Sequence, residues 1–127
     1  MKIFFIGLGG AIGAIARYMV SGWVYAVTGA YFPWGTFVIN LTGSLFIGFL
    51  WGAFEEASMS HNMRMFFIVG LLGSFTTFST FSFENVQLIR DSEFGLMGLN
   101  IAISVVGGIA MVFIGMLCVR LLMTSLR

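Results

Sequence analysis

The sequence predicts an all-α membrane protein with four transmembrane helices in each subunit. Of its 127 residues, 59% are hydrophobic and only 9% are charged, whereas a soluble domain carries about 25% charged residues. Four apolar segments fill most of the chain, and about 20 apolar residues are enough to cross a bilayer. The sequence is therefore predicted to form a single four-helix transmembrane domain over residues 1–127, with loops too short to fold as an extramembrane domain.

The four segments follow one another along the chain. The first spans about residues 3–23, and we expect it to be retained rather than cleaved as a signal peptide, because its apolar run continues past Arg17. The second follows Pro33, a residue well suited to a helix N-terminus, and ends near residue 54. The third spans 65–83 and the fourth 94–122. The connections at 24–32, 55–64 and 84–93 contain the only histidine and the acidic residues.

The third segment contains a polar stretch that is unusual for a transmembrane helix. Residues 74–82 read SFTTFSTFS, which places six hydroxyl groups and three aromatic rings in nine residues. Because lipid offers no water to satisfy polar groups, such hydroxyls should face protein or a water-filled path. The stretch also follows Gly70 and Gly73, where a helix could be interrupted. We expect the third helix to be broken near residues 73–77 and to line a permeation site.

Charge gives only a weak signal for orientation. With four spans, one side of the membrane would carry four basic residues and the other side two (Lys2, Arg64, Arg120 and Arg127 against Arg17 and Arg90). The positive-inside rule normally produces a larger asymmetry. The count leaves two alternatives open, insertion in both orientations and a fixed topology with a small bias. The formal net charge of +1 argues against a nucleic-acid partner, which requires a concentrated basic patch.

Small residues recur at the four-residue spacing that lets membrane helices approach closely. The pairs are Gly9 with Gly13, Gly48 with Gly52, Ser44 with Gly48, and Ser104 with Gly108. In a bilayer, close packing replaces the hydrophobic attraction that joins helices in water. The pattern predicts compact helix packing, either within a subunit or between subunits.

The sequence shows no arrangement of residues typical of an enzyme. The residues Glu55, Glu56, Asp91 and Glu93 lie in predicted loops, and His61 has no metal-ligand partner at a useful spacing. No serine or cysteine is spaced as a nucleophile beside a base, and no phosphate-binding loop is present. Cys118 is the only cysteine, so the chain can form no internal disulfide. We therefore predict a protein without catalytic activity.

Three uncharged side chains could instead interact with an anion. Asn40 lies in the middle of the second segment, where it could form an interhelical hydrogen bond or line an anion pathway as an amide donor. Phe78 and Phe81, three residues apart, share a helix face, where they could simply pack. The edge of an aromatic ring is electropositive and can also face an anion. Ring edges, an amide and hydroxyls would form the neutral donor set that a small, strongly hydrated anion needs.

Three blocks of the sequence resemble the Fluc (CrcB) family of bacterial fluoride channels. They are GGAIGAIARY at 9–18, GTFVINLTGS at 35–44 and GLLGSFTTFSTFSFE at 70–84, and they cover most of the first three segments. The resemblance implies a fluoride-selective channel that exports fluoride passively and relieves its toxicity. It also implies an antiparallel, dual-topology homodimer in the bacterial inner membrane, with two pores and a structural sodium ion (Na+) at the centre of the dimer interface.

The resemblance also assigns roles to individual residues. Phe78 and Phe81 correspond to the pore-lining phenylalanines and Asn40 to the pore asparagine, while Thr77 and Ser79 belong to a polar track. The backbone carbonyls of Gly73 and Thr76 fall where the family holds sodium. The remaining matches are Arg17, Glu84 and the pore-side Ser104, whereas Asn100 and Gly108 stand where some members carry tyrosine and serine.

Two other functions fit parts of the sequence. A small dual-topology, proton-coupled multidrug exporter has a similar size, but it needs an ionisable carboxylate within the membrane. The first two segments contain no acidic residue before Glu55, and Glu84 is predicted to lie at the end of the third. A non-transporting helical assembly protein would explain the glycine pairs and leave the hydroxyl-rich stretch unexplained.

Overall fold

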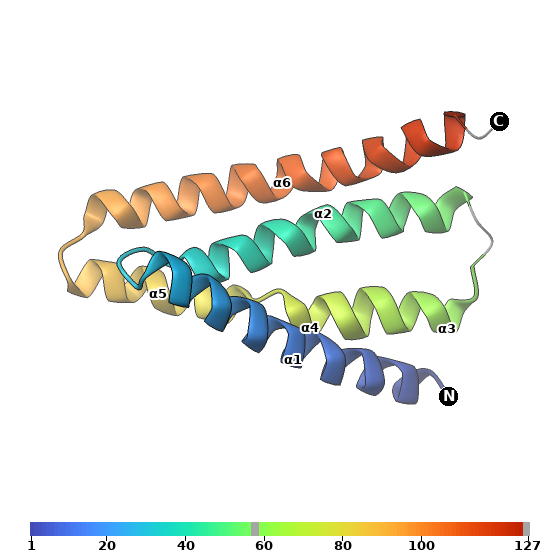
Figure 1. The fold of residues 1–127 in the computed structure, drawn as a ribbon, viewed down its shortest axis with the longest axis horizontal. Helices are drawn as coiled ribbons and strands as arrows, with labels where there is room; N and C mark the ends of the chain where they lie inside the picture. Colours follow the sequence, from blue (N-terminus) through green and yellow to red (C-terminus); the bar gives the residue numbers. More distant parts are fainter. Residues whose placement is uncertain (57–58, 126–127) are drawn as a thin grey trace.

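The computed structural model describes residues 1–56 and 59–125, and the regular structure within these ranges is entirely helical (Figure 1). Four stretches are long and apolar enough to cross a membrane, which confirms the predicted four spans. Three of them are single helices and the other, which we call the third span, runs from His61 to Arg90 in several pieces. The single helices are α1 (Lys2–Thr28), α2 (Trp34–Glu56) and α6 (Phe94–Ser125).

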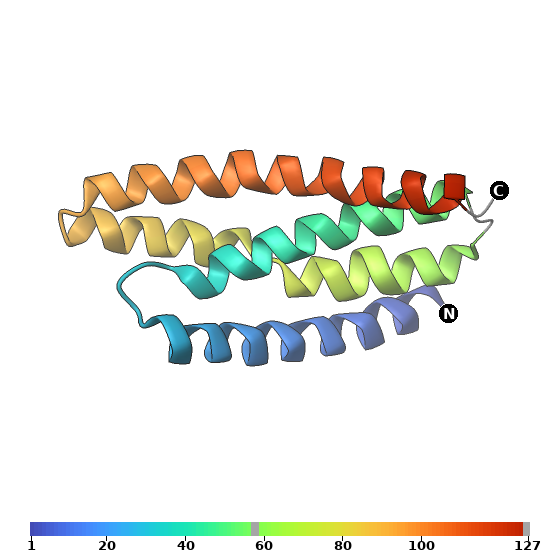
Figure 2. The same ribbon diagram turned by 45° about the horizontal axis from the view of Figure 1, so that its top comes forward.

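The four spans run side by side in alternating directions. The N-terminus, the end of α2 and the C-terminal end of α6 lie at one end of the bundle (Figures 1 and 2). The turn between α1 and α2 and the turn that leads into α6 lie at the other end. Helix α2 packs along α6, and α1 packs against the first half of the third span. This arrangement places the predicted loops on alternate sides of the bundle.

The third span is broken where the sequence predicts. It consists of α3 (His61–Arg64), the π-helix η1 (Met65–Leu72), α4 (Gly73–Phe75) and α5 (Phe78–Arg90). Between α4 and α5, Thr76 and Thr77 have extended backbones, with φ and ψ of −80° and 158° and of −151° and 119°. The interruption therefore falls on two threonines rather than on a glycine. The π-helical stretch was not predicted.

The predicted end of the third span was wrong. Helix α5 continues through Glu84 to Arg90, so Glu84 lies inside a helix and not in a loop. The helix persists because Asn85 and Leu88, three residues apart, both turn inward and are buried. Only residues 91–93 connect α5 to α6. At the other boundaries, α2 begins directly after Pro33 as expected, and α1 extends five residues beyond its predicted end.

Glycines of the predicted pairs allow close helix contacts within the subunit. A side chain on Gly13 in α1 would collide with the backbone carbonyl of Leu71 in η1. A side chain on Gly48 in α2 would likewise collide with the carbonyl of Val112 in α6, and one on Gly115 with the carbonyl of Leu45. These glycines let the backbones of α1 and η1, and of α2 and α6, lie in direct contact. Both contacts hold the second and third spans in fixed positions around the break.

Candidate permeation site

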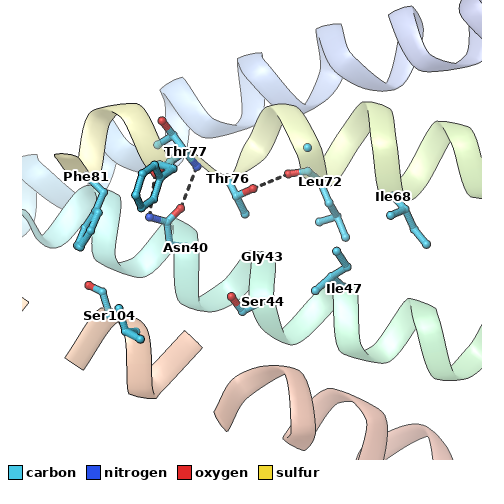
Figure 3. Close-up of a pocket in the computed structure, with 13 residues that line it drawn as sticks. Asn40, Gly43, Ser44, Ile47, Ile68, Leu72, Thr76, Thr77, Phe81 and Ser104 are labelled. Carbon is cyan, nitrogen blue, oxygen red and sulfur yellow. Dashed lines mark hydrogen bonds between the residues drawn. The ribbon is translucent and has the colours of Figure 1, made fainter. Parts of the chain in front are cut away.

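The break in the third span is paired with one side chain of α2. The backbone N–H of Thr77 donates to Oδ1 of Asn40 at 2.9 Å, and Nδ2 of Asn40 donates to the carbonyl oxygen of Thr77 at 3.1 Å (Figure 3). A continuous helix would instead direct that N–H to the carbonyl of Gly73. Asn40 thus supplies the hydrogen bonds that the helix gives up, which backbone groups in a membrane require. One hydrogen of the Asn40 amide nitrogen remains after this pairing.

Hydroxyl groups form further hydrogen bonds with the backbone at the break. Oγ1 of Thr77 caps α5 by accepting a hydrogen bond from the backbone N–H of Thr80 at 3.3 Å, and it donates to Oγ1 of Thr80 at 3.0 Å. Oγ1 of Thr76 donates to the carbonyl of Leu72 at 2.9 Å. Helix α5 therefore begins at the break. The N–H groups of its first turn that lack a helical partner carry partial positive charge.

A pocket of about 360 Å³, which we call the central pocket, lies between α2, the broken third span and α6 (Figure 3). None of its lining side chains carries a charge. Its polar lining comes from Asn40, Ser44, Thr76, Thr77 and Ser104. Its apolar lining includes Phe78 and Phe81 together with Ile47, Ile68, Leu72 and Val105. The structure thus brings five of the six predicted pore residues together, while Ser79 lies outside this pocket with its Oγ 3.4 Å from Oγ1 of Thr77.

The two phenylalanine rings line the same pocket, as their spacing predicts. Their centroids are 5.9 Å apart and their planes are inclined by 37°. Phe81 is partly buried, whereas Phe78 is 79% exposed. A single subunit therefore leaves the pocket open on the side of Phe78. Gly73, Ser79 and Thr80 are exposed as well.

A second polar cluster surrounds Glu84. The hydroxyl groups of Tyr25 and Thr36 donate to its Oε1 at 2.8 Å and 2.6 Å. Its Oε2 is buried and has no hydrogen-bond partner among the described residues. We did not single out Tyr25, Thr36 or Thr80 from the sequence, although helical spacing was a usable signal. Thr36 lies one turn before Asn40 in α2, and Thr80 and Glu84 share a face of α5 with Thr77.

Two further cavities lie near the central pocket and Glu84. The first, the Arg17 cavity, has a volume of about 460 Å³ and is lined by Arg17, Thr36, Thr77, Thr80 and neighbouring residues. The second, the Glu84 cavity, has a volume of about 600 Å³ and includes Tyr25, Glu84, Arg90 and Asp91. Thr77 lines both the central pocket and the Arg17 cavity, and Tyr25 lines both the Arg17 and Glu84 cavities. Each of the two neighbouring pairs of spaces therefore has a lining residue in common.

The two carbonyls that the sequence suggested as sodium ligands both lack their usual helical hydrogen bond. The N–H of Thr77 goes to Asn40 instead of Gly73, and the N–H of Thr80 goes to Oγ1 of Thr77 instead of the carbonyl of Thr76. Carbonyl oxygens that a helix does not use are ligands suited to a hard cation. The carbonyl oxygen of Thr76 accepts a hydrogen bond from Nη1 of Arg17 at 3.5 Å. Within the described ranges, no group of three or more acidic, histidine or cysteine residues could hold a metal ion.

Helix α6 contributes two adjacent residues to the central pocket. Ser104 and Val105 line it, while Asn100 is buried behind Ser104 and is 1% exposed. Gly108 faces α2, where an added side chain would contact Oγ of Ser44 at 3.5 Å. The structure thus places Asn100 and Gly108 outside the pocket wall.

Comparison with known proteins identifies the family. The family described as CrcB-like protein, Camphor Resistance (CrcB), matches residues 4–116. The chain belongs to the CrcB-like family. This CrcB-like chain is 42% identical over 117 residues to a protein of Syntrophotalea carbinolica named Fluoride-specific ion channel FluC, a match covering 91% of this chain and 94% of that one. The resemblance seen in the three sequence blocks is thereby confirmed.

Other relatives carry the same name. A protein of Hydrogenovibrio crunogenus is 45% identical over 116 residues, covering 91% of this chain and 88% of its own. A protein of Magnetococcus marinus is 42% identical over 123 residues, covering 96% of this chain and all of its own. Because the matches extend over nearly the whole chain, the CrcB-like assignment includes the break and all four spans.

Proposed function

We propose that this CrcB-like protein is a fluoride-selective ion channel that exports fluoride passively and thereby relieves its toxicity, with no enzymatic step. The central pocket carries this proposal, because it combines an amide, hydroxyls and two aromatic rings without a charged side chain. The names of the relatives, which are fluoride-specific ion channels, support the same ion. The four spans place the protein in a membrane as a multi-pass protein, and we propose the bacterial inner membrane.

The chemistry of the pocket suits an anion that holds its water tightly. A pore must replace that water with hydrogen-bond donors, yet binding must stay weak enough for the ion to leave. The remaining Asn40 hydrogen, the Ser79 hydroxyl and the ring edges of Phe78 and Phe81 are neutral groups of this kind. The hydroxyl hydrogens of Thr77 and Ser104 are directed to Thr80 and Asn100 instead. The positive N-terminus of α5 adds a partial charge and not a full one. Such a set can attract fluoride without trapping it.

The lining residues that the cavities share support a route for the ion. From the central pocket the ion would pass Thr77 into the Arg17 cavity and continue past Tyr25 into the Glu84 cavity. Thr80 and Thr36 line the Arg17 cavity and supply hydroxyls along the way. The guanidinium of Arg17 would favour an anion in this cavity, where it lies near the break and not in the central pocket.

The exposed face of the site supports a homodimer, which we propose to be antiparallel. Ser79 and Thr80 are exposed and Phe78 is 79% exposed, although they lie within a membrane-spanning stretch. Hydroxyl groups facing lipid would have no water to bond, so a second copy of the chain is the natural cover. Two copies in opposite orientations would give two equivalent pores. Subunit counting by single-molecule photobleaching in liposomes should show two subunits per assembly, and a monomer that transports would contradict the dimer.

The carbonyls of Gly73 and Thr76, which accept no helical hydrogen bond, support a structural sodium ion at the dimer interface. Gly73 is exposed, so its carbonyl can be shared with a second subunit. A bound cation there would keep the neighbouring anion pathway electropositive. Rigorous replacement of sodium by a large organic cation should impair transport or dissociate the dimer. Unchanged transport by an intact dimer would contradict the sodium role.

The exporter alternative must be weighed again, because Glu84 lies within the third span. Its Oε1 accepts hydrogen bonds from Tyr25 and Thr36, and it stands apart from the central pocket, which contains no acid. Growth of a bacterium that lacks its own fluoride exporter separates the functions. Expression of the wild-type chain should restore growth on fluoride and leave sensitivity to the cationic drug ethidium unchanged. Drug resistance without fluoride resistance would favour the exporter, and neither phenotype would favour an assembly protein.

A further inference from the structure

Two asparagines behind the central pocket form a buried bridge between α5 and α6. Asn100 is 1% exposed and Asn85 is 7% exposed. Nδ2 of Asn100 donates to Oδ1 of Asn85 at 3.2 Å. Buried amides are costly unless their polar atoms are paired, so the bridge constrains how the two helices can lie.

The direction of this hydrogen-bond chain is fixed at one end. Nδ2 of Asn85 donates to the backbone carbonyl of Phe81 at 2.7 Å. Because a carbonyl oxygen can only accept, Asn85 must turn its nitrogen toward Phe81 and its oxygen toward Asn100. Asn100 must then turn its own nitrogen toward Asn85, which leaves its Oδ1 facing Ser104. The hydroxyl of Ser104 donates to that oxygen at 3.2 Å.

Both ends of the bridge reach the central pocket, while its two asparagines do not line it. Ser104 has a single hydroxyl hydrogen, and that hydrogen is directed to Asn100. As long as the bridge is intact, Ser104 can offer the pocket only its oxygen lone pairs. A lone pair repels an anion, whereas a hydroxyl hydrogen would bind it.

We propose that Asn100, held in place by Asn85, is a positioning residue that keeps the Ser104 hydrogen out of the pocket and so weakens anion binding at the α6 wall. The donors that bind the ion then come from α2 and α5, on the opposite side of the pocket. Weak binding at one wall favours release, which conduction requires. The inference rests on the proposed fluoride transport, because the affected ion is fluoride.

The test uses fluoride efflux from liposomes at graded fluoride concentrations. Asn100→Leu removes the acceptor and frees the hydroxyl, so the fluoride concentration for half-maximal flux should fall about two- to tenfold, as expected for one neutral hydrogen bond. Ser104→Ala should raise this concentration in the Asn100→Leu background, where it removes a donor. In the wild-type background the same change should lower it, because it removes a lone pair. A change of the same sign in both backgrounds would overturn the proposal.

Stability measurements keep the inference testable if a variant folds poorly or the wild type does not transport. Asn100→Leu leaves the Asn85 oxygen unpaired, and Asn85→Leu leaves the Asn100 nitrogen unpaired. The double variant removes both groups, so its melting temperature should fall by less than the sum of the two single decreases. The transport comparison can then be repeated in the double variant. Additive decreases would overturn the bridge, whereas absent fluoride flux in the wild type alone would count against the proposed function.

Discussion

Asn40 and Thr77, 37 residues apart in the sequence, are joined by a reciprocal pair of hydrogen bonds that uses both ends of one amide group. Asn40 accepts from the backbone N–H of Thr77 and donates to the carbonyl of the same residue. One side chain thus satisfies both polar groups of an extended residue inside a membrane-spanning stretch. This pairing explains how the third span can be interrupted at two threonines.

We therefore predict that Asn40→Asp disrupts the break. A carboxylate oxygen would replace Nδ2 and face the carbonyl of Thr77, leaving both acceptors without a donor. A lost buried hydrogen bond of this kind costs about 1–3 kcal/mol, and a carboxylate would also repel an anion in the central pocket. The melting temperature and the fluoride efflux rate should both fall. The matched control is Asn62→Asp in α3, outside the pocket, and equal effects of the two changes would contradict the role of Asn40.

The two pocket phenylalanines should be required for transport. Phe78→Ile and Phe81→Ile retain an apolar side chain but remove the polarised ring edge. We expect each to slow fluoride efflux by more than about tenfold, equivalent to roughly 1.4 kcal/mol, while the protein remains folded. Phe83→Ile is the control, because Phe83 lies on the same helix, is 59% exposed and does not line the pocket. Normal efflux in well-folded Phe78→Ile and Phe81→Ile proteins would assign both rings to packing.

Close backbone contact should make Gly13 far less tolerant than Gly22, although both lie in α1. A valine at position 13 would collide with the carbonyl of Leu71, whereas nothing lies within 4 Å of a Cβ at Gly22. Overpacking of this kind typically costs about 1–3 kcal/mol. Size-exclusion profiles and melting temperatures should show that Gly13→Val is destabilised and Gly22→Val is close to wild type. Equal melting temperatures would mean that the α1 and η1 backbones are not in contact.

From the small, four-to-two asymmetry of the basic residues, we predict that the chain inserts in both orientations. Met59 is exposed in the connection between the second and third spans and is a suitable position for a reporter cysteine. In a Cys118→Ser background, Met59→Cys should be labelled by a membrane-impermeant reagent from both sides of the membrane in a single preparation. Labelling from one side only would establish a fixed topology.

Most of the fold could be predicted because its signals are local. Apolar length defines the four spans, Pro33 marks the start of α2, and hydroxyls within an apolar run indicate the break. The actual extent of α5 could not be read from apolar length, since Glu84 and Asn85 look like loop residues until their helical face is known. Thr36 and Tyr25 were missed because their importance comes from Glu84, 48 and 59 residues away. Helical spacing places Thr36 on the face of Asn40, but only the packing of the spans brings Thr36 and Tyr25 into contact with Glu84.

The residues of the site could be predicted from the sequence, but their hydrogen-bond partners could not. The sequence indicated that Asn40, Phe78 and Phe81 belong together, and the structure places all three around one pocket. The sequence could not show that the amide of Asn40 forms hydrogen bonds with the backbone of Thr77, or that the hydroxyl hydrogen of Ser104 is directed to Asn100. These assignments depend on which acceptor each donor meets in three dimensions. The same side chains in another packing would present different atoms to the ion.

The most direct test of the central claim is fluoride release from liposomes that contain the purified wild-type protein, followed with a fluoride electrode. Valinomycin allows potassium to move as the balancing charge, and no pH gradient is imposed. We predict rapid fluoride release once valinomycin is added, and chloride release no faster than from protein-free liposomes. Fluoride release that never exceeds the protein-free rate, or that requires a proton gradient, would contradict a passive fluoride channel.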